Sequence, residues 1–337
     1  MDRSAANAYV YAKVCGMLSK SYVGERAAKL FSVKSLNELW GLLFAEEVPA
    51  VPETLLARQI EKKSEEKFIS EYIKLVSCYS KPAKLLVNLL RSYDYENIKE
   101  IGAALCFKEN KLPEVVDIGS FSEINYDEWP NIAKMTENSA FAWYNKIPDI
   151  HEQQLNDTKL DQQFVYEIFT AIKELPAEER NIALSLFKEE YILQNIVWVM
   201  RLRVYYGLEK EDILARLAYT TFNYDVADEI ASPAIKIVDY PVDSYSEWAE
   251  WEYKDLLNPN EEGVVWNLDP RWFEGEARKK VCRSAEKLLH RYPDSVGVLL
   301  CFFKMKSHEL DCIRSIAEGL KMSVDAGQIM LAAGVNK

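Results

Sequence analysis

Three stretches of the chain decide its fold: LLRSYDYENIKEIGAAL at 89–105, LFKEEYILQNIVWVMRL at 186–202 and FFKMKSHELDCIRSIAEGL at 302–320. Each opens with an apolar pair and a polar patch, and apolar residues at helical spacing then follow Asn97-Ile98, Asn195-Ile196 or Cys312-Ile313. A charged break and a shorter helical pattern come next in each case. Self-similarity of this kind is typical of repeated structural units. We therefore predict three related helical units.

The remaining sequence has the same helical periodicity, and no stretch shows the alternation of a half-buried strand. Glycine and proline occur only 12 times each in 337 residues, so the turn residues that an all-β fold requires are scarce. The sequence predicts an all-α fold. Expected helix starts are marked by Pro82, Pro176, Pro270 and Pro293, expected ends by Gly207 and Gly319, and expected N-caps by Asp157 and Ser323.

The three units are assigned to residues 1–120, which include the N-terminal helix, 121–221 and 222–337. The third unit contains an acidic insertion at 222–270, which carries twelve acidic and two basic residues. The following stretch, 271–321, is basic, with eleven basic and seven acidic residues. We interpret the insertion as a solvated acidic surface. The alternative is a face that meets a basic partner or stays clear of an anionic membrane.

The overall charge and composition exclude several classes of protein. The net charge is −12, whereas a nucleic-acid-binding protein needs a basic face that displaces counterions from phosphates. The longest strongly apolar run, 296–303, is far shorter than the roughly 20 residues of a membrane span. No secretory signal opens the chain, and its six cysteines form no CxxC pair. We therefore expect a soluble protein with reduced thiols, as in the cytosol.

The sequence carries no recognisable catalytic motif. The patterns GxGxxG, GxxxxGK[ST] and GxSxG are all absent, and the three histidines form neither HExxH nor ExxH. Glu286 and His290 lie four residues apart, but such a pair is more often a solvated helix face than a metal site. We predict no catalytic residue, no cofactor, no metal site and no small-molecule substrate.

Two groups of residues admit two interpretations each. Asn97 and Asn195 lie beside apolar stripes, and we interpret them as buried amides that hold a neighbouring backbone rather than a ligand. The aromatic cluster that contains Trp248 and Trp251, in an expected short helix, is interpreted as local core, with an interface hot spot as the alternative.

Basic residues near the repeated motif and in the basic stretch are candidates for a protein interface. They are Arg91, Lys99, Lys279, Lys280, Arg283, Lys306 and Arg314. Complementary charge sets the register in which two proteins dock, so these residues are predicted to face a partner. The alternative is that they only keep the surface soluble.

The repeated motifs together resemble a known family, the C-type central-stalk subunit of V/A-type rotary ATPases, whose eukaryotic members are called d-type. The resemblance rests on four segments in the same order, which nearly span the chain. They are YVYAKVCGM at 9–17, LRSYDYENIK at 90–99, YILQNI at 191–196, and FFKMKSHEL at 302–310 followed by IRSI at 313–316.

The resemblance implies a funnel-shaped all-α protein of three similar units about a pseudo-threefold axis. Such a subunit sits on the cytoplasmic face of the membrane, bound to the proteolipid ring. It receives the tip of the central shaft, built from D- and F-type subunits, and couples ATP turnover to ion transport without an active site. Two alternatives stay open: a helical enzyme with an unrecognised diphosphate- or lipid-binding pocket, and a generic α-solenoid scaffold, whose repeats would be shorter.

Overall fold

The computed structural model describes residues 2–335, and every regular element in that range is a helix. The predicted all-α fold is confirmed. Six long helices, joined in pairs by short turns, contain most of the helical residues: α3 (Glu53–Val76) with α4 (Lys84–Cys106), α6 (Ile150–Lys173) with α7 (Ala177–Val204), and α10 (Pro270–Arg291) with α11 (Gly297–Lys321).

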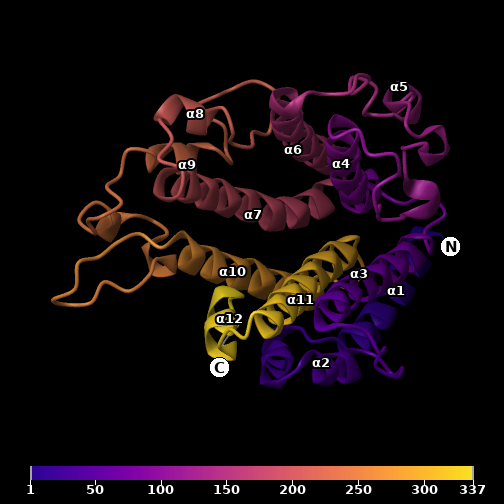
Figure 1. The fold of residues 1–337 in the computed structure, drawn as a ribbon, viewed down its shortest axis with the longest axis horizontal. Coiled ribbons are helices and arrows are strands. Elements are labelled where there is room, and N and C mark those ends of the chain that lie inside the picture. The colour runs from indigo at the N-terminus through magenta and orange to yellow at the C-terminus, as the bar shows by residue number, and fades with distance from the viewer. Residues whose placement is uncertain (1, 336–337) are drawn as a thin grey trace.

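The six long helices form a closed ring (Figure 1). Each helix packs on the next long helix along the chain, and α11 returns to pack along α3. As a result, each long helix has a long-helix neighbour on both sides. The arrangement of the three helix pairs about a pseudo-threefold axis, as a funnel, stays a prediction.

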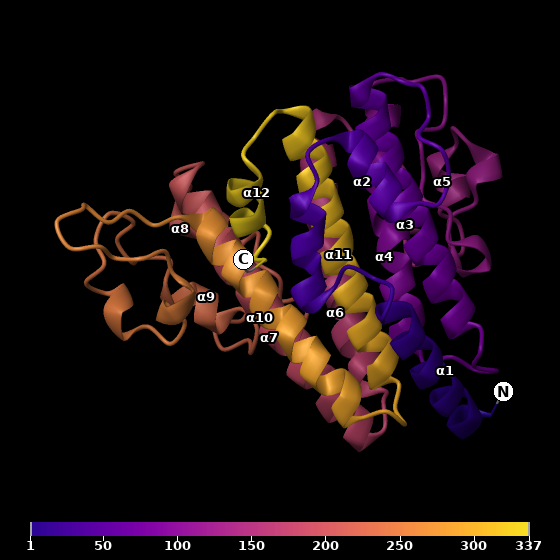
Figure 2. The ribbon, with the colours of Figure 1, turned by 90° about the horizontal axis from the view of Figure 1, so that it is seen from below.

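Shorter elements cover this ring on the outside. Near α3 and α11 lie α1 (Arg3–Leu18), a 3-10 helix (Gly24–Ser32), α2 (Leu36–Leu43) and α12 (Ala326–Ala332) (Figure 2). The connection from α4 to α6 contains α5 (Ile132–Met135), and the connection from α7 to α10 contains α8 (Lys210–Leu214) and α9 (Ser232–Lys236). These connections are otherwise irregular or form short 3-10 turns.

The core follows from the apolar spacing of the long helices. On α7, for example, Ile182, Leu186, Leu193 and Met200 are all buried, and they share one face of the helix. Burial of a side chain of this size contributes roughly 1.5–3 kcal/mol. The largest apolar cluster contains residues of all six long helices and of α1, so one core joins the three helix pairs.

Helix starts agree in part with the sequence prediction. Pro176 and Pro270 do lie at the starts of α7 and α10. The prediction for Asp157 is wrong, because α6 begins seven residues earlier at Ile150 and Asp157 lies inside it. The actual N-cap is Asp149, whose carboxylate accepts the backbone N–H groups of His151 and Glu152 while the Glu152 carboxylate accepts that of Asp149.

The second helix of each pair ends in the same way. A residue in the left-handed backbone region follows α4, α7 and α11: Lys108 at φ +57°, Gly207 at φ +60° and Ser323 at φ +56°. Ser323 therefore ends α11 and does not cap α12 as predicted. Gly207 ends α7 as predicted, but Gly319 lies inside α11, where Ile329 of α12 leaves no room for a Cβ atom.

A large apolar side chain precedes each of these three helix-ending residues. Phe107, Tyr206 and Met322 are 69%, 70% and 65% exposed. We call these three residues the apolar rim. Three equivalent helix ends with equivalent exposed side chains add support to the predicted division into three units at residues 120 and 221, which stays a prediction.

The turns between paired helices meet at the opposite ends of the long helices. Asn7 of α1 donates to the carbonyl of Asp294 at 2.6 Å and accepts the Tyr79 hydroxyl at 2.8 Å, so it joins the α3–α4 and α10–α11 turns. Glu179, in the first turn of α7, accepts the backbone N–H of Val296 at 3.3 Å. These contacts hold the three turns together.

The acidic insertion extends from one side of the ring (Figure 1). Trp248, Trp251 and Trp266 are buried within it, so the interpretation of the aromatic cluster as local core is confirmed. The expected helix around Trp248 is wrong, because only a 3-10 turn (Trp248–Glu250) forms there. The Trp248 indole N–H donates to the carbonyl of Pro241 at 2.7 Å, which anchors this turn.

Candidate functional site

Three of the predicted interface residues come together on one face of α10. Lys279, Lys280 and Arg283 line a shallow pocket of about 260 Å³, together with Lys287. We call these four residues the α10 basic face. Lys280 Nζ lies 2.9 Å from Oε1 of Glu189 on α7, whereas Arg283 forms no ion pair within the described part of the chain. Lys279 Nζ lies 3.1 Å from Oε1 of Glu276 on the same helix, so the α10 basic face combines two ion pairs with a free guanidinium.

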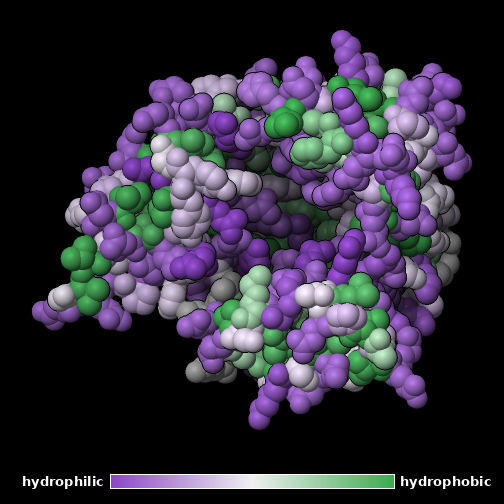
Figure 3. All heavy atoms as spheres, viewed as in Figure 1, coloured by the Kyte–Doolittle hydropathy of each residue, from purple (hydrophilic) through white to green (hydrophobic). Residues whose placement is uncertain are grey.

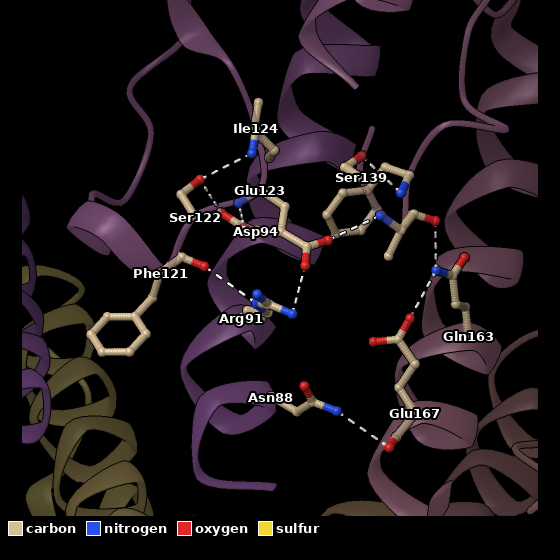
Figure 4. A network of polar contacts seen from close by, with 12 residues as sticks. Asn88, Arg91, Asp94, Phe121, Ser122, Glu123, Ile124, Ser139, Gln163 and Glu167 are labelled. Carbon is tan, nitrogen blue, oxygen red and sulfur yellow. Dashed lines mark hydrogen bonds and ion pairs between the residues drawn. The ribbon is translucent and has the colours of Figure 1, made fainter. Parts of the chain in front are cut away.

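Arg91 holds the segment that follows α4 (Figure 4). Its guanidinium lies 2.6 Å from the Glu123 carboxylate and donates to the carbonyl of Phe121 at 3.3 Å. The neighbouring Asp94 accepts the Ser122 hydroxyl and the backbone N–H of Glu123, both at 2.8 Å. Arg91 is thus occupied within the chain.

The other predicted interface residues lie apart from the α10 basic face and from one another. Lys99 Nζ is 2.6 Å from Asp161, which joins α4 to α6. Lys306 is buried and pairs with Glu309, and Arg314 pairs with Glu65 of α3. The structure therefore brings together only the α10 residues of the predicted set, and contact of any of them with a partner stays a prediction.

Asn97 and Asn195 are buried amides that hold backbone, as interpreted from the sequence. The Asn97 amide donates to the carbonyl of Val116 and accepts its N–H, both at 2.8 Å. The Asn195 amide accepts the N–H of Ala218 at 2.9 Å and donates to the carbonyls of Ala218 and Ile230 at 2.9 and 3.0 Å. Each amide fixes the irregular segment that follows its helix.

A hollow bordered largely by hydrophilic residues opens on the face seen in Figure 3, where α7 faces α10 and α11. A pocket of about 300 Å³ lies between these three helices, and we call it the central pocket. Its polar lining residues are Glu190, Gln194, Arg201, Glu274, Arg278, Lys304, Ser307, His308 and Asp311. Trp198, half exposed, is the largest aromatic side chain in this lining.

A continuous chain of ion pairs runs through the central pocket and across four helices. In order, its members are Arg201 of α7, Glu274 and Arg278 of α10, Asp311 and Arg314 of α11, and Glu65 of α3. The pairs within α10 and between α10 and α11 measure 2.7 and 3.8 Å. Single exposed pairs contribute only about 0–1 kcal/mol each, but these pairs are linked into one network that connects the four helices.

The sequence did not single out Arg201, Glu274 or Arg278 in this network. The four-residue spacing of Glu274 and Arg278 is the one local signal that could have pointed to them. The pair Asp311–Arg314 is also local, with three-residue spacing, but the remaining links join distant parts of the chain, as in Arg314–Glu65, whose members are 249 residues apart.

Burial keeps His308, which lines the central pocket, and the neighbouring thiol of Cys312 neutral. It lowers the pKa of His308, and it raises the pKa of Cys312 to about 12. The His308 Nε2 atom lies 3.8 Å from the Cys312 Sγ atom. A thiol with this pKa is not a nucleophile at neutral pH, so this pair adds neither charge nor a reactive thiolate to the pocket.

Two further features of residues 2–335 bear on the kind of protein. No group of three histidine, cysteine or acidic side chains in this range is placed to hold a metal ion. None of the helices in the same range combines the length and the apolar character that crossing a membrane requires.

These observations define a class of protein: an all-α frame whose long helices form a closed ring around a hydrophilic hollow. A family model for the ATP synthase (C/AC39) subunit matches residues 10–330, and the chain belongs to this family of V/A-type rotary ATPase subunits. The chain is also 29% identical over 318 residues to an uncharacterized protein of Treponema pallidum (strain Nichols). The aligned residues make up 94% of this chain and 93% of that relative. The resemblance found in the sequence is confirmed.

Proposed function

We propose that this chain is a non-catalytic coupling subunit in the central stalk of a V/A-type ATPase. It links the rotating shaft of D- and F-type subunits to the proteolipid ring on the cytoplasmic face of the membrane. Membership of the C/AC39 family supports a role in a rotary ATPase. The closed ring of helices supports the specific role of carrying torque.

The single observation that carries this proposal is the ion-pair chain across α7, α10, α11 and α3. A part that transmits torque must resist sliding and rotation of its helices against one another. A close-packed helical core already has low compressibility. Ion pairs across each helix boundary add fixed points, and closure of α11 onto α3 leaves no edge at which the ring can open.

The surfaces of the molecule also fit two protein partners. A hydrophilic hollow suits the tip of a shaft that enters and is held by polar contacts (Figure 3). The apolar rim offers three exposed side chains at equivalent helix ends, and such side chains on a polar surface are typical of protein contact sites. In this proposal, three units at 1–120, 121–221 and 222–337 surround the hollow as a funnel.

Affinity purification from native membranes tests the proposal. The tagged full-length chain should co-purify with the shaft subunits and the proteolipid ring, and the purified chain alone should not hydrolyse ATP. Recovery of only the free chain, together with intact rotary complexes in cells that lack it, would contradict the proposal.

Charge reversal tests the α10 basic face as part of the interface. The variant Lys279→Glu, Lys280→Glu, Arg283→Glu should reduce co-purification of partners by tenfold or more, because each reversal places like charges across the contact, at a cost of about 1 kcal/mol or more. Arg283→Glu alone disturbs no ion pair of the described chain and should give a smaller loss. The matched control is Lys81→Glu, Lys111→Glu, Lys146→Glu, which changes the net charge equally. Equal assembly of both triple variants would remove the α10 basic face from the interface.

A further inference from the structure

A second pocket lies on the opposite face of α11 from the central pocket. It has a volume of about 620 Å³ and is enclosed by α1, α2, α3 and α11. Residues 306, 309, 310 and 313 of α11 line it, and at 100° per residue they point away from residues 304, 307, 308 and 311 of the central pocket. Its volume lies within the range of about 300–1,000 Å³ that is typical of small-molecule sites.

Three lysines line this pocket without a counter-ion. Lys13 comes from α1, Lys20 from the turn after it, and Lys67 from α3. All three are exposed, and within residues 2–335 none of them forms an ion pair. The ammonium group of Lys13 lies 5.6 Å from the centre of the Tyr9 ring. We call this cavity the basic pocket.

The two carboxylates of the basic pocket are already committed to Lys306. The Glu309 carboxylate pairs with the Lys306 ammonium and also accepts the backbone N–H of Tyr22. The Glu71 carboxylate lies 4.0 Å from the same ammonium. Lys306 and the two carboxylates together carry one negative charge, so Lys13, Lys20 and Lys67 leave the pocket with a net charge of +2 for another anion.

Ser64 supplies a second and independent observation. Its side chain is only 6% exposed and lines the basic pocket, and its hydroxyl has no hydrogen-bond partner in the described structure. A buried polar group without a partner is rare and points to a water molecule, an ion or a ligand at that position. A hydroxyl beside three ammonium groups is suited to donate to an anion.

We infer that the basic pocket binds a phosphate-bearing ligand. The phosphate group lies among the ammonium groups of Lys13, Lys20 and Lys67 and accepts the hydroxyl of Ser64. Lysine binds phosphate as a point charge, so three lysines on two helices and a turn converge on one anion without a fixed fork geometry. Apolar walls formed by Leu42, Phe44, Leu310 and Ile313 leave space for an organic portion of the ligand.

This site is separate from the coupling role proposed above. Its walls come from α1, α2, α3 and α11, so a bound ligand ties the N-terminal segment to the helix that closes the ring. A ligand that binds only the folded chain raises its melting temperature.

Binding is measured on the full-length chain with two probes, inorganic phosphate and phosphatidylcholine vesicles with or without phosphatidylglycerol. We expect saturable binding that weakens with added salt. The variant Lys13→Gln, Lys20→Gln, Lys67→Gln should lose about tenfold or more in affinity, since hydrogen bonds to charged groups are removed. The matched control Lys81→Gln, Lys111→Gln, Lys146→Gln removes as much charge elsewhere and should bind as the unmodified chain does.

Ser64→Ala gives an independent readout. Affinity should fall several-fold, while the free energy of unfolding without ligand stays equal or rises, because a buried hydroxyl without a partner is removed. Phosphate binding that depends on the three lysines identifies a small phosphate ligand, and lysine-dependent binding to the anionic vesicles alone identifies a lipid headgroup; either supports the inference. Absence of binding to both probes, or the same loss in the control triple variant, overturns it.

Discussion

The first two helical units and the third differ at one corresponding position of the repeated motif. Asn97 and Asn195 each hold an irregular segment that folds back over their helix, whereas Cys312 is buried among apolar side chains. After α11 the chain passes directly to α12, whose Ile329 packs against Gly319. The amide is therefore present where a long irregular segment must be fixed, and an apolar side chain suffices where a helix follows.

The largest effect is expected for Asn195→Leu. The side chain is 0% exposed, and its removal leaves the Ala218 N–H and the carbonyls of Ala218 and Ile230 without partners. We expect a loss of about 4 kcal/mol in the free energy of unfolding, measured in urea. The neighbouring exposed Gln194→Ala should change it by less than about 0.5 kcal/mol. Equal effects of the two variants would refute the role of the amide.

Asn97→Leu should have a smaller effect, of about 2–3 kcal/mol by the same measurement. The lost partners are the backbone of Val116 and the Tyr126 hydroxyl. Arg91 and Asp94 hold the same segment from the same helix, so it stays attached when the amide is removed (Figure 4). A larger loss of unfolding free energy than for Asn195→Leu would show that Arg91 and Asp94 do not hold the segment when the amide is absent.

Cys312→Asn tests the comparison from the other side, because it places the amide where the chain has no segment to hold. The site is fully buried, so the amide loses its water without gaining a backbone partner. We expect a loss of about 2 kcal/mol in the free energy of unfolding. Cys312→Ala, which removes only volume, should lose about 1 kcal/mol. A more stable Cys312→Asn variant would mean that the third unit also has a backbone segment that an amide at this position can hold.

The smallest change in the free energy of unfolding is expected for a variant of Asp157, which lies on α6 of the second unit near Lys99 of the first. Partial burial raises the pKa of this carboxyl to about 6, despite the nearby charge of Lys99. Because the folded chain prefers the protonated acid, the contribution of this carboxyl to stability is greatest below about pH 4 and is lost as the pH rises through 6. Asp157→Asn should therefore add about 1 kcal/mol at pH 7.5, after solvent screening is allowed for.

The pH dependence is the control for this variant. The gain from Asp157→Asn should shrink when unfolding is measured at pH 5, since the native carboxyl is then largely protonated. A gain that is equal at both pH values would mean that it has no electrostatic origin.

The local part of this structure could be predicted from the sequence. The apolar stripe of α7 follows one helical period over many residues, so its buried face was correct, as was the role of Asn195 in it. The start of α6 was misjudged because the stripe is weak there, with Ile150 and Leu155 exposed. Asp149 is identified as the cap by the backbone N–H groups that its carboxylate accepts and by the return contact from Glu152.

The candidate sites depend on contacts that no local pattern encodes. The sequence had marked Lys306 and Arg314 only as charges beside a motif. Lys306 does pair with Glu309 on its own helix, but it also donates to Ser21, 285 residues away, and Arg314 pairs with Glu65, 249 residues away. Lys13 and Lys67 likewise meet only because α1 and α3 both lie near α11. Charge and spacing gave the candidates, but packing decides which of them converge.

Closure of the ring between α3 and α11 has a consequence for synthesis of the protein. Glu65 is made 249 residues before its partner Arg314. At roughly 5–20 residues per second, α3 waits about 12–50 s on the ribosome before the helix that covers it exists. During this interval Phe68 and Tyr72, which later pack against Phe303 of α11, lack that partner. The N-terminal third of a nascent chain is thus exposed to aggregation and to chaperones until its last long helix has been made.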